Sequence, residues 1–308
     1  MPSPTDVELQ RAAELIRQGG LVAFPTETVY GLGANALDAD AVRRIFKAKR
    51  RPWASPLIVH VGDEAMARTV SAEWPAMARH LARAFWPGPL TMVLKKASIV
   101  PDVVTANLDS VGIRMPSHPI ALELIRAAGV PIAAPSANRF SELSPTSADH
   151  VRESLGDEVD LILDGGPTTV GIESTVVSLH RNPPAVLRPG MITKQEVERV
   201  TGVRFDSELD LPHIVESPGQ NPRHYAPRTR FLLLERGSQP PDGRGRFLIL
   251  SKNPKEFAAS LYAELHKADR EGWDWIAIER PSNTPEWAGI LDRLQRATFV
   301  ETSEGATA

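Results

Sequence analysis

Apolar residues recur at helical spacing near the start of the chain, over residues 7–18, and Gly19 and Gly20 then end the pattern. Three later segments repeat this spacing, and between them lie short apolar runs that are typical of buried strands. The pattern predicts helices over residues 7–18, 39–47, 76–85 and 120–128, and strands over residues 21–24, 57–61, 90–94, 111–115, 131–134, 161–164, 174–179 and 185–188. Because strands and helices alternate, we expect an α/β domain with a twisted mixed sheet.

The periodic pattern stops over residues 206–229, a proline-rich stretch that we interpret as a linker. Beyond it the pattern resumes and predicts a small Rossmann-like α/β domain of βαβ character. Its strands are expected over residues 231–234, 246–250 and 275–278, and its helices over residues 254–267 and 286–297. The predicted organisation is therefore a first domain over 1–205, a linker over 206–229 and a second domain over 230–308.

The length and the charge limit the possible functions. A chain of 308 residues favours two domains. A formal net charge of -3 argues against a chain-wide basic surface for nucleic acid or membranes, so an anion site has to be local. The sequence contains no cysteine, which excludes disulfides, thiolate nucleophiles and zinc held by cysteine. The first residues lack a signal-peptide layout and no apolar run is long enough to span a bilayer, so we predict a cytoplasmic location.

The segment FPTETVYGLGANA leaves a predicted strand through a turn with two threonine hydroxyls, and Gly31 and Gly33 follow. Glycine lets the backbone approach a ligand closely. Taken alone, the segment is as typical of a strand–turn–helix connection whose hydroxyls cap a helix.

A cluster of basic residues follows at the end of a predicted helix: Arg43, Arg44, Lys47, Lys49, Arg50 and Arg51. Most such clusters are solvated helix faces. Here the cluster runs directly into Pro52 and an apolar strand, which places some of the charges at the edge of the fold, where a polyphosphate could bind. His60 ends that strand, and a lone histidine is more often a hydrogen-bonded core residue than a ligand contact.

Polar residues recur in three later segments. Arg114 lies in a short strand, where a half-buried arginine needs an acidic partner or an anionic ligand such as a carboxylate. The hydroxyl-rich segment APSANRFSELSPTSADHV suits phosphates and sugars, but also ordinary turns. GIEST and LRPG add Ser174, Thr175 and Arg188. The sequence has no GxxxxGK[ST] loop, no GxGxxG after a strand, no HExxH and no nucleophile elbow, which disfavours covalent-nucleophile hydrolases and zinc enzymes.

Seven segments, in this order, resemble the threonylcarbamoyl-AMP synthase family, whose core is the YrdC-like domain. They are FPTETVYGLG, the KxRP element of Lys49, Arg51 and Pro52, PLIVHV, the arginine of GIRMP, PSAN, GIEST and LRPG. The resemblance covers about residues 7–205. SPGQNPRHYAP resembles the linker of the family's long, two-domain form, and the residues after it resemble that form's C-terminal domain.

The resemblance implies a nucleotidyltransferase reaction. Family members make L-threonylcarbamoyladenylate and pyrophosphate from L-threonine, bicarbonate and ATP with Mg²⁺. A downstream threonylcarbamoyl transferase complex then modifies an adenosine of tRNA. From the charge and the hydropathy we expect no stable nucleic-acid binding and no membrane association.

Site residues follow from the matching motifs. Lys49 and Arg51 match the basic pair near the phosphates and are the expected catalytic residues. The ATP-binding residues implied by the resemblance are Arg51, Ser55, Ser110, Ser136, Asn138, Ser144, Arg188 and Tyr225. Those implied for L-threonine are Thr28, His60, Arg114, Ala134 and Ser174. Tyr225 belongs to the linker, which is expected to close over the nucleotide.

Two features depart from the family pattern. Ser55 stands where the family often has lysine or asparagine, so this position brings no charge to ATP. PSNTPEWAG replaces a glycine-rich stretch of the C-terminal domain.

Two alternatives belong to other classes. A double-stranded RNA-binding module would use the basic concavity of a YrdC-like domain, but the net charge and the few aromatics near the basic cluster argue against it. A carbamoyl-transfer domain normally sits beside zinc-finger segments, which a chain without cysteine cannot form. The synthase prediction requires Arg51, Arg114 and Arg188 to meet in one cavity.

Overall fold

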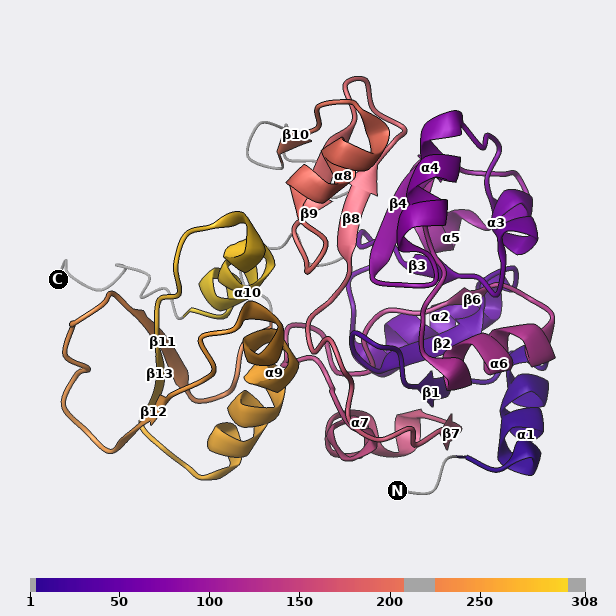
Figure 1. Ribbon diagram of the computed structural model, residues 1–308. Coiled ribbons are helices and arrows are strands. Elements are labelled where there is room, and N and C mark those ends of the chain that lie inside the picture. The colour runs from indigo at the N-terminus through magenta and orange to yellow at the C-terminus, as the bar shows by residue number, and fades with distance from the viewer. Residues whose placement is uncertain (1–3, 208–224, 299–308) are drawn as a thin grey trace, which may run out of the picture.

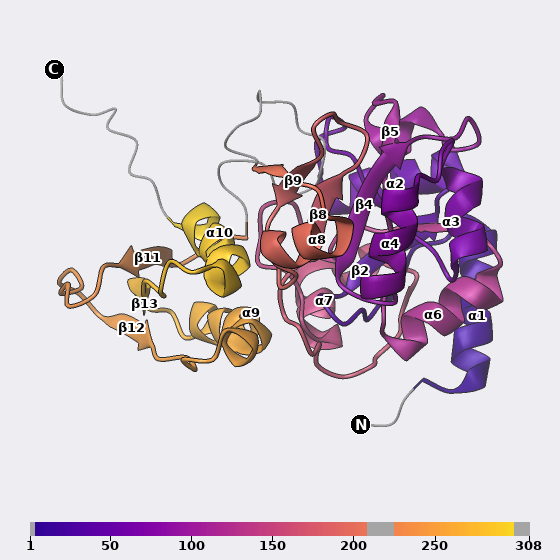
Figure 2. The ribbon, with the colours of Figure 1, turned by 45° about the horizontal axis from the view of Figure 1, so that its top comes forward.

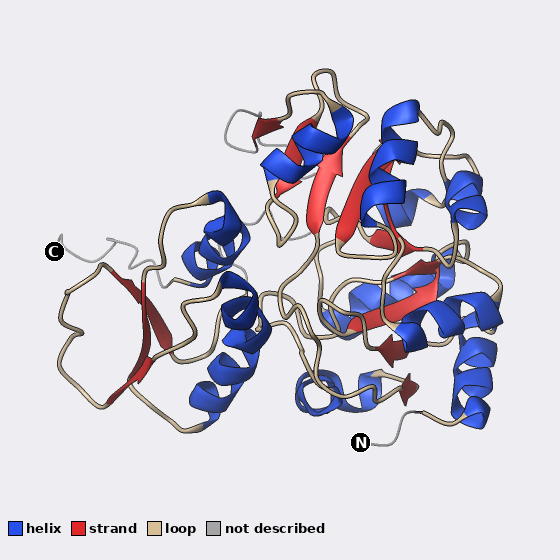
Figure 3. Cartoon of the chain, viewed as in Figure 1, coloured by secondary structure: helices blue, strands red, loops and turns tan. Residues whose placement is uncertain are grey.

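The computed structural model describes residues 4–207 and 225–298. These residues form a 10-stranded mixed sheet with helices around it and a separate 3-stranded sheet (Figures 1 and 3). The predicted fold class, a twisted mixed-sheet α/β domain followed by a small α/β domain, is confirmed.

The large sheet has the strand order β10-β9-β8-β4-β5-β3-β6-β2-β1-β7 and mixes parallel with antiparallel neighbours. Its strands are β1 (Val22–Phe24), β2 (Gly31–Asn35), β3 (Ile58–His60), β4 (Leu90–Lys95), β5 (Ser110–Arg114), β6 (Ile132–Ala133), β7 (Leu161–Ile162), β8 (Thr175–Ser178), β9 (Ala185–Arg188) and β10 (Asp206–Ser207). All eight strands predicted for this domain from apolar runs are present, and their ends differ from the predicted ones by at most two residues.

The helices of the large domain are α1 (Asp6–Arg17), α2 (Ala39–Lys49), α3 (Glu64–Val70), α4 (Ala76–Phe85), α5 (Asp102–Thr105), α6 (Pro119–Ala128), α7 (Ala148–Leu155) and α8 (Lys194–Thr201), with a 3-10 turn over Gly156–Glu158. α1 begins with a capping box, in which Thr5 and Glu8 each accept a hydrogen bond from the other's backbone N–H. Its apolar face packs against that of α6 in one buried cluster. The cluster includes Ala12, Ala13, Ile16, Ala121, Leu124 and Ile125.

β2 corrects the interpretation of FPTETVYGLGANA as a strand–turn–helix connection. Gly31–Asn35 pairs with β1 as an antiparallel strand, although two glycines give it little intrinsic strand preference. A β-carbon on Gly33 would lie 2.7 Å from a ring carbon of Phe24 and 2.8 Å from Ile132. Gly33 therefore permits close packing inside the domain, and only Gly31 borders a cavity.

Several short helices were absent from the sequence prediction. α8 has one buried residue, Val197, and α3 has two, Ala67 and Val70. So few buried positions give no clear apolar stripe, and these helices are instead supported by their caps and by tertiary packing. α7 and α5 were also absent from the prediction; α5 is a single turn of four residues, too short to show a helical period.

The small domain contains β11 (Arg230–Leu234), β12 (Gly245–Leu248), α9 (Pro254–Arg270), β13 (Trp275–Glu279), a 3-10 turn over Pro285–Trp287 and α10 (Ala288–Ala297). Its parallel sheet has the order β11-β13-β12. In both views α9 and α10 lie between this sheet and the large domain (Figures 1 and 2). Val29, Leu143 and Ile172 of the large domain share a buried apolar cluster with Phe257 and Leu261 of α9.

The domain boundaries stay a prediction. β10 pairs in parallel with β9, so the first two residues of the expected linker extend the large sheet. Residues 208–224, most of that linker, lie outside the described residues. None of the helices in the described ranges is both long enough and apolar enough to cross a bilayer.

Candidate active site

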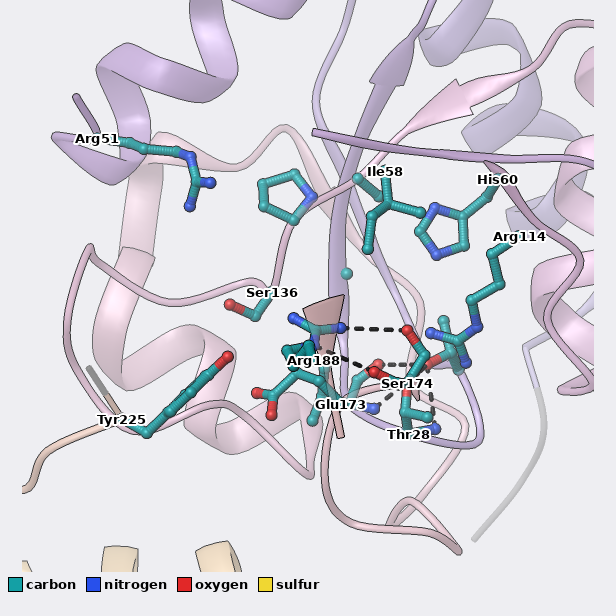
Figure 4. A pocket seen from close by; sticks show the side chains of 15 residues that line it. Thr28, Arg51, Ile58, His60, Arg114, Ser136, Glu173, Ser174, Arg188 and Tyr225 are labelled. Atoms are coloured by element: carbon teal, nitrogen blue, oxygen red, sulfur yellow. Dashed lines mark hydrogen bonds between the residues drawn. The ribbon is translucent and has the colours of Figure 1, made fainter. Parts of the chain in front are cut away.

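An open cavity lies on the large domain beside the small one (Figure 4). The space between its walls, open solvent included, is about 520 Å³. The lining residues come from separate stretches of the sequence: Thr26, Thr28, Val29, Gly31, Arg51, Ile58, His60, Arg114, Ala134, Pro135, Ser136, Glu173, Ser174, Arg188 and Tyr225. Arg51, Arg114 and Arg188, which the sequence prediction required to meet, border the same cavity.

The turn after β1 contributes threonine side chains to the cavity. The hydroxyl of Thr26 donates to the carbonyl oxygen of Val29 at 2.7 Å and accepts from the backbone N–H of Thr28 at 3.2 Å. The hydroxyls of Thr26 and Thr28 lie 2.8 Å apart. Because the hydroxyl of Thr26 fixes the turn through the backbone of Thr28 and Val29, Thr28 is held with its side chain toward the cavity.

His60 and Arg114 lie at one end of the cavity. β3 and β5 are parallel neighbours, and their register pairs these two residues at the carboxyl ends of both strands. Burial, and then the charge of Arg114, lower the pKa of His60 to about 3, so its imidazole is neutral near pH 7. Its Nδ1 is buried and has no hydrogen-bond partner among the described residues. A ligand bound here could supply that partner.

Arg188 and Ser174 occupy the middle of the cavity. β9 ends at Arg188 beside the start of the antiparallel β8. Nε of Arg188 donates to the carbonyl oxygen of Ser174, and an Nη atom donates to its hydroxyl, both at 3.1 Å. The hydroxyl of Ser174 also lies 2.8 Å from that of Thr91. These contacts hold Arg188 close to the hydroxyl.

Arg51, Ser136 and Tyr225 lie at the other end of the cavity (Figure 4). Arg51 donates to the carbonyl oxygens of Ser55 at 3.4 Å and Pro56 at 3.1 Å, which orients its guanidinium. Burial, together with the charge of Arg188, lowers the pKa of Arg51 to about 10, so the side chain stays cationic near pH 7. The cavity thus has a cationic, hydroxyl-bearing end.

Tyr225 comes from the described end of the expected linker. Its side chain is 1% exposed and borders the cavity, and its backbone has a positive φ of 62°. A non-glycine residue adopts this conformation only where its surroundings hold it. The tyrosine ring lies over the guanidinium of Arg293, 5.3 Å from Cζ to the ring centroid.

Five expected site residues lie outside the cavity lining. Lys49 is 1% exposed and its ammonium group donates to the carbonyl oxygens of Ser136, at 2.6 Å, and Asn138. Lys49 therefore holds the PSAN loop through these two carbonyl oxygens and does not border the cavity.

The other four residues also have structural contacts or lie buried away from the lining. The amide nitrogen of Asn138 donates to carbonyl oxygens within its own loop, at 2.9 Å. Ser55 orients Arg51 through its carbonyl oxygen, and Ser144 donates to Glu173. Ser110 is buried at the start of β5.

Other lining residues were absent from the sequence prediction. Thr26 lies in the threonine-containing turn of FPTETVYGLGANA but was given no role there, because its part in shaping the turn is visible only in its hydrogen bonds. Glu173 lies in GIEST directly before Ser174, and its acidic side chain was not expected in an anion site. Its partners come from distant segments, so the sequence around it gives no signal for the role.

A twisted mixed sheet whose loops gather buried arginines and hydroxyls around one cavity defines an α/β enzyme with an anion-binding site. A protein-family model described as "Telomere recombination" (Sua5/YciO/YrdC) matches residues 14–190. A second, described as "Threonylcarbamoyl-AMP synthase, C-terminal domain", matches residues 192–298. The chain belongs to the threonylcarbamoyl-AMP synthase family in its two-domain form.

Similar proteins cover nearly the whole chain. The threonylcarbamoyl-AMP synthase of Pyrococcus abyssi is 41% identical, over 94% of each chain. That of Bacillus subtilis is 40% identical, over 96% of this chain and 94% of the relative. The crystal structure of P. abyssi Sua5 complexed with L-threonine superposes with a TM-score of 0.90 at 38% identity, over 96% of each chain.

Proposed function

We propose that this chain is an L-threonylcarbamoyladenylate synthase, which uses ATP to convert L-threonine and bicarbonate into threonylcarbamoyl-AMP and pyrophosphate. The observation that carries the proposal is one cavity with a cationic end at Arg51 and a second end at His60 and Arg114. The P. abyssi relative that superposes over nearly the whole chain was solved with L-threonine. The alternative of a double-stranded RNA-binding module is not favoured, because the three arginines are buried around a cavity rather than spread over a surface.

The two substrates would occupy opposite ends of the cavity. Thr28, His60, Arg114, Ala134 and Ser174 would bind L-threonine, with the neutral Nδ1 of His60 available to the amino acid. Arg51, Ser136 and Tyr225 would bind ATP, with its phosphates toward Arg188. The α-phosphate would then meet the amine end of threonine near Arg188 and Ser174.

The reaction needs two bond-forming steps. The amine of threonine, after losing a proton, attacks bicarbonate carbon; a C–N bond forms, water leaves, and N-carboxythreonine results. An oxygen of the new carboxylate attacks the α-phosphorus of ATP in line, and the bond from that phosphorus to the β-phosphate oxygen breaks, releasing pyrophosphate. Arg51 and Arg188 would stabilise the charge that develops on the phosphates. No covalent enzyme intermediate is required.

Mg²⁺ would enter with ATP. No group of three or more histidine or acidic side chains within residues 4–207 and 225–298 could hold a metal ion. The cavity-lining carboxylate, Glu173, already accepts hydrogen bonds at both oxygens. Mg²⁺ commonly binds mainly through substrate phosphates. We therefore treat MgATP as the substrate and assign the ion no ligand from the described residues.

Tyr225 supports the expectation that the linker covers the nucleotide. Its buried ring borders the ATP end of the cavity, where it would shield a labile mixed anhydride from water. Tyr225→Ala should lower synthesis while Tyr225→Phe retains most of it. Wild-type synthesis in Tyr225→Ala would contradict this role. The receiving transferase complex and the cytoplasmic location remain predictions from the resemblance and the sequence.

The function is tested by incubating the protein with ATP, Mg²⁺, bicarbonate and single amino acids while pyrophosphate is measured. We expect release that requires both threonine and bicarbonate. Release without threonine would contradict the proposal, and equal release with serine would change the assigned substrate.

A further inference from the structure

Arg293 of α10 reaches the cavity wall of the other domain. Its side chain is 0% exposed, and its Nε lies 2.7 Å from a carboxylate oxygen of Glu173. Glu173 directly precedes Ser174 and borders the cavity itself. The pair therefore connects the small domain to the middle of the proposed active site.

Both carboxylate oxygens of Glu173 are occupied. One accepts from the hydroxyl of Ser144 at 2.5 Å, and the other from Arg293 and from the hydroxyl of Tyr262, on α9, at 3.3 Å. Arg293 also donates to the carbonyl oxygens of Glu173, at 3.3 Å, and Pro189, at 3.0 Å. One side chain thus joins the loop before Ser174 to the loop after Arg188.

The same two loops pack directly against the backbone of α9 and α10. A β-carbon on Gly171 would lie 2.2 Å from the carbonyl oxygen of Ala258 in α9. One on Gly289, in α10, would lie 2.7 Å from Cα of Gly190. Backbone meets backbone at both places, so the small domain holds both loops in one position.

Without a paired cation, the carboxylate of Glu173 would repel an anion bound in the cavity. Burial by itself raises the pKa of its carboxyl, and the charges of Arg293 and Arg188 outweigh that effect, so the pKa lies below its ordinary value. The carboxylate is therefore ionised near pH 7 in the wall of a cavity proposed to bind a triphosphate. Its charge is acceptable there because a buried cation pairs with it.

We propose that Arg293 is a positioning residue of the synthase: it neutralises Glu173 and fixes the loops of Ser174 and Arg188, so that the cavity presents positive charge to the phosphates of ATP. This role rests on the proposed function. It assigns the small domain a part in ATP binding although no residue of α9 or α10 lines the cavity.

Arg293→Met removes the charge and keeps a long apolar side chain. The unpaired carboxylate should then repel the triphosphate and attract Arg188 away from Ser174. We expect ATP binding, measured by titration calorimetry without threonine, to weaken by about 10- to 100-fold, by analogy with outer partners of ligand-binding residues. Threonine binding should change less.

A matched control separates this effect from general loosening of the domains. Arg270 of α9 pairs with Glu153 of α7 across the same domain interface, but both side chains are about half exposed and neither lines the cavity. Arg270→Met should leave ATP binding unchanged. An equal loss in both variants would mean that Arg293 only helps to dock the domains.

The double variant Glu173→Gln with Arg293→Met tests the charge directly. An uncharged pair of similar volume can replace a buried ion pair without loss of folding, and glutamine can still accept from Ser144. We expect it to bind ATP more tightly than Arg293→Met alone. A double variant that binds ATP as weakly as Arg293→Met overturns the proposal. If Arg293→Met fails to fold, the double variant is compared with wild type instead: ATP binding close to that of wild type supports the proposal, and binding about 10- to 100-fold weaker overturns it.

The pH dependence gives a readout that docking alone would not move. Glu173 faces Arg293 of α10, Tyr262 of α9, and Arg188 and Tyr225 at the cavity, and Asp292 of α10 pairs with the same Arg293. Without Arg293, burial still raises the pKa of Glu173 and the charge of Arg188 alone opposes it, so the pKa is higher than in wild type. Lowering the pH then protonates the carboxylate earlier than in wild type and removes the repulsion. The defect of Arg293→Met relative to wild type should shrink between pH 8 and pH 6. A constant defect would contradict the proposal.

These measurements are independent of turnover. If wild-type protein released no threonine-dependent pyrophosphate, the proposed function would fail, whereas the calorimetric comparison would still report whether Arg293 governs ATP binding. If wild-type protein is active and Arg293→Met binds ATP as wild type does, the positioning role is wrong and the function stands.

Discussion

An Nη atom of Arg114 lies 2.7 Å from a carboxylate oxygen of Glu27, and the two side chains are 5% and 6% exposed. The second oxygen of Glu27 accepts from the backbone N–H of Ser117 at 3.0 Å. The buried arginine thus has the acidic partner that its position in a short strand required. The pair connects the threonine-rich turn after β1 to the end of β5. It therefore fixes the distance between these two segments, which border the cavity at the end that contains His60.

Arg114→Met should destabilise the fold, because it leaves Glu27 buried without its cation. Breaking a buried pair on one side costs about 3–5 kcal/mol. Urea unfolding at pH 7.5 measures the loss. Glu27→Gln combined with Arg114→Met should recover much of it. A loss below about 1 kcal/mol in Arg114→Met would show that Glu27 is easily solvated, contrary to its burial.

Arg51→Met should reduce kcat/KM for ATP by about 10²–10³, by analogy with removal of one donor to a transition-state charge. Threonine affinity should hold, since Arg51 lies at the opposite end of the cavity from His60 and Arg114 (Figure 4). Arg50→Met is the matched control, because Arg50 is adjacent, exposed and outside the lining. An unchanged rate of ATP-dependent pyrophosphate release in Arg51→Met would refute the assignment.

Lys49→Met tests whether this lysine supports the PSAN loop or touches the phosphates. Its ammonium group donates to two loop carbonyls, so the substitution leaves both without that donor. Each buried polar group that loses its partner costs about 1–3 kcal/mol, so we expect thermal stability and ATP affinity to fall together. Loss of activity at wild-type stability would instead favour the direct phosphate role that the motif suggested.

Acid should weaken the contact between the domains. The rings of His150, in α7, and His266, in α9, stack with centroids 3.8 Å apart. Burial, and then the charges of His266 and Arg270, lower the pKa of His150 to about 3, and burial also lowers the pKa of His266. Asp149, Glu153 and Asp269 face the pair and only partly offset this.

The direction in which stability changes with pH follows from how many protons the folded and the unfolded chain bind. Below about pH 6.5 the unfolded chain protonates these histidines while the folded chain does not, so stability is full above that pH and falls as pH drops toward 3. His266→Gln removes one titrating group and can still donate to the carbonyl oxygen of Ser144. Urea unfolding between pH 7.5 and 5.5 should show a shallower slope in the variant, by at most about 1.4 kcal/mol per pH unit. Parallel slopes would exclude these histidines as the cause.

The sequence predicted those features that depend on a local pattern. α4 and β9 have the predicted bounds because their apolar periodicity continues to both ends. β2 was not predicted because GLGAN becomes a strand only through pairing with β1. Arg51, Arg114 and Arg188 were identified from motifs, whereas Glu173 was not, since its decisive partner Arg293 lies 120 residues away. Contacts of that kind exist only after the two domains pack.

The most direct test of a shared cavity for threonine and ATP follows the label from [¹⁴C]bicarbonate. With ATP, Mg²⁺ and threonine, we expect the wild-type chain to form a labelled product whose mass equals that of a threonylcarbamoyl group joined to AMP, in an amount equal to the pyrophosphate released. Arg51→Met should form this product about 10²- to 10³-fold more slowly. Pyrophosphate release without label in an adenylate, or a labelled adenylate formed without threonine, would contradict it.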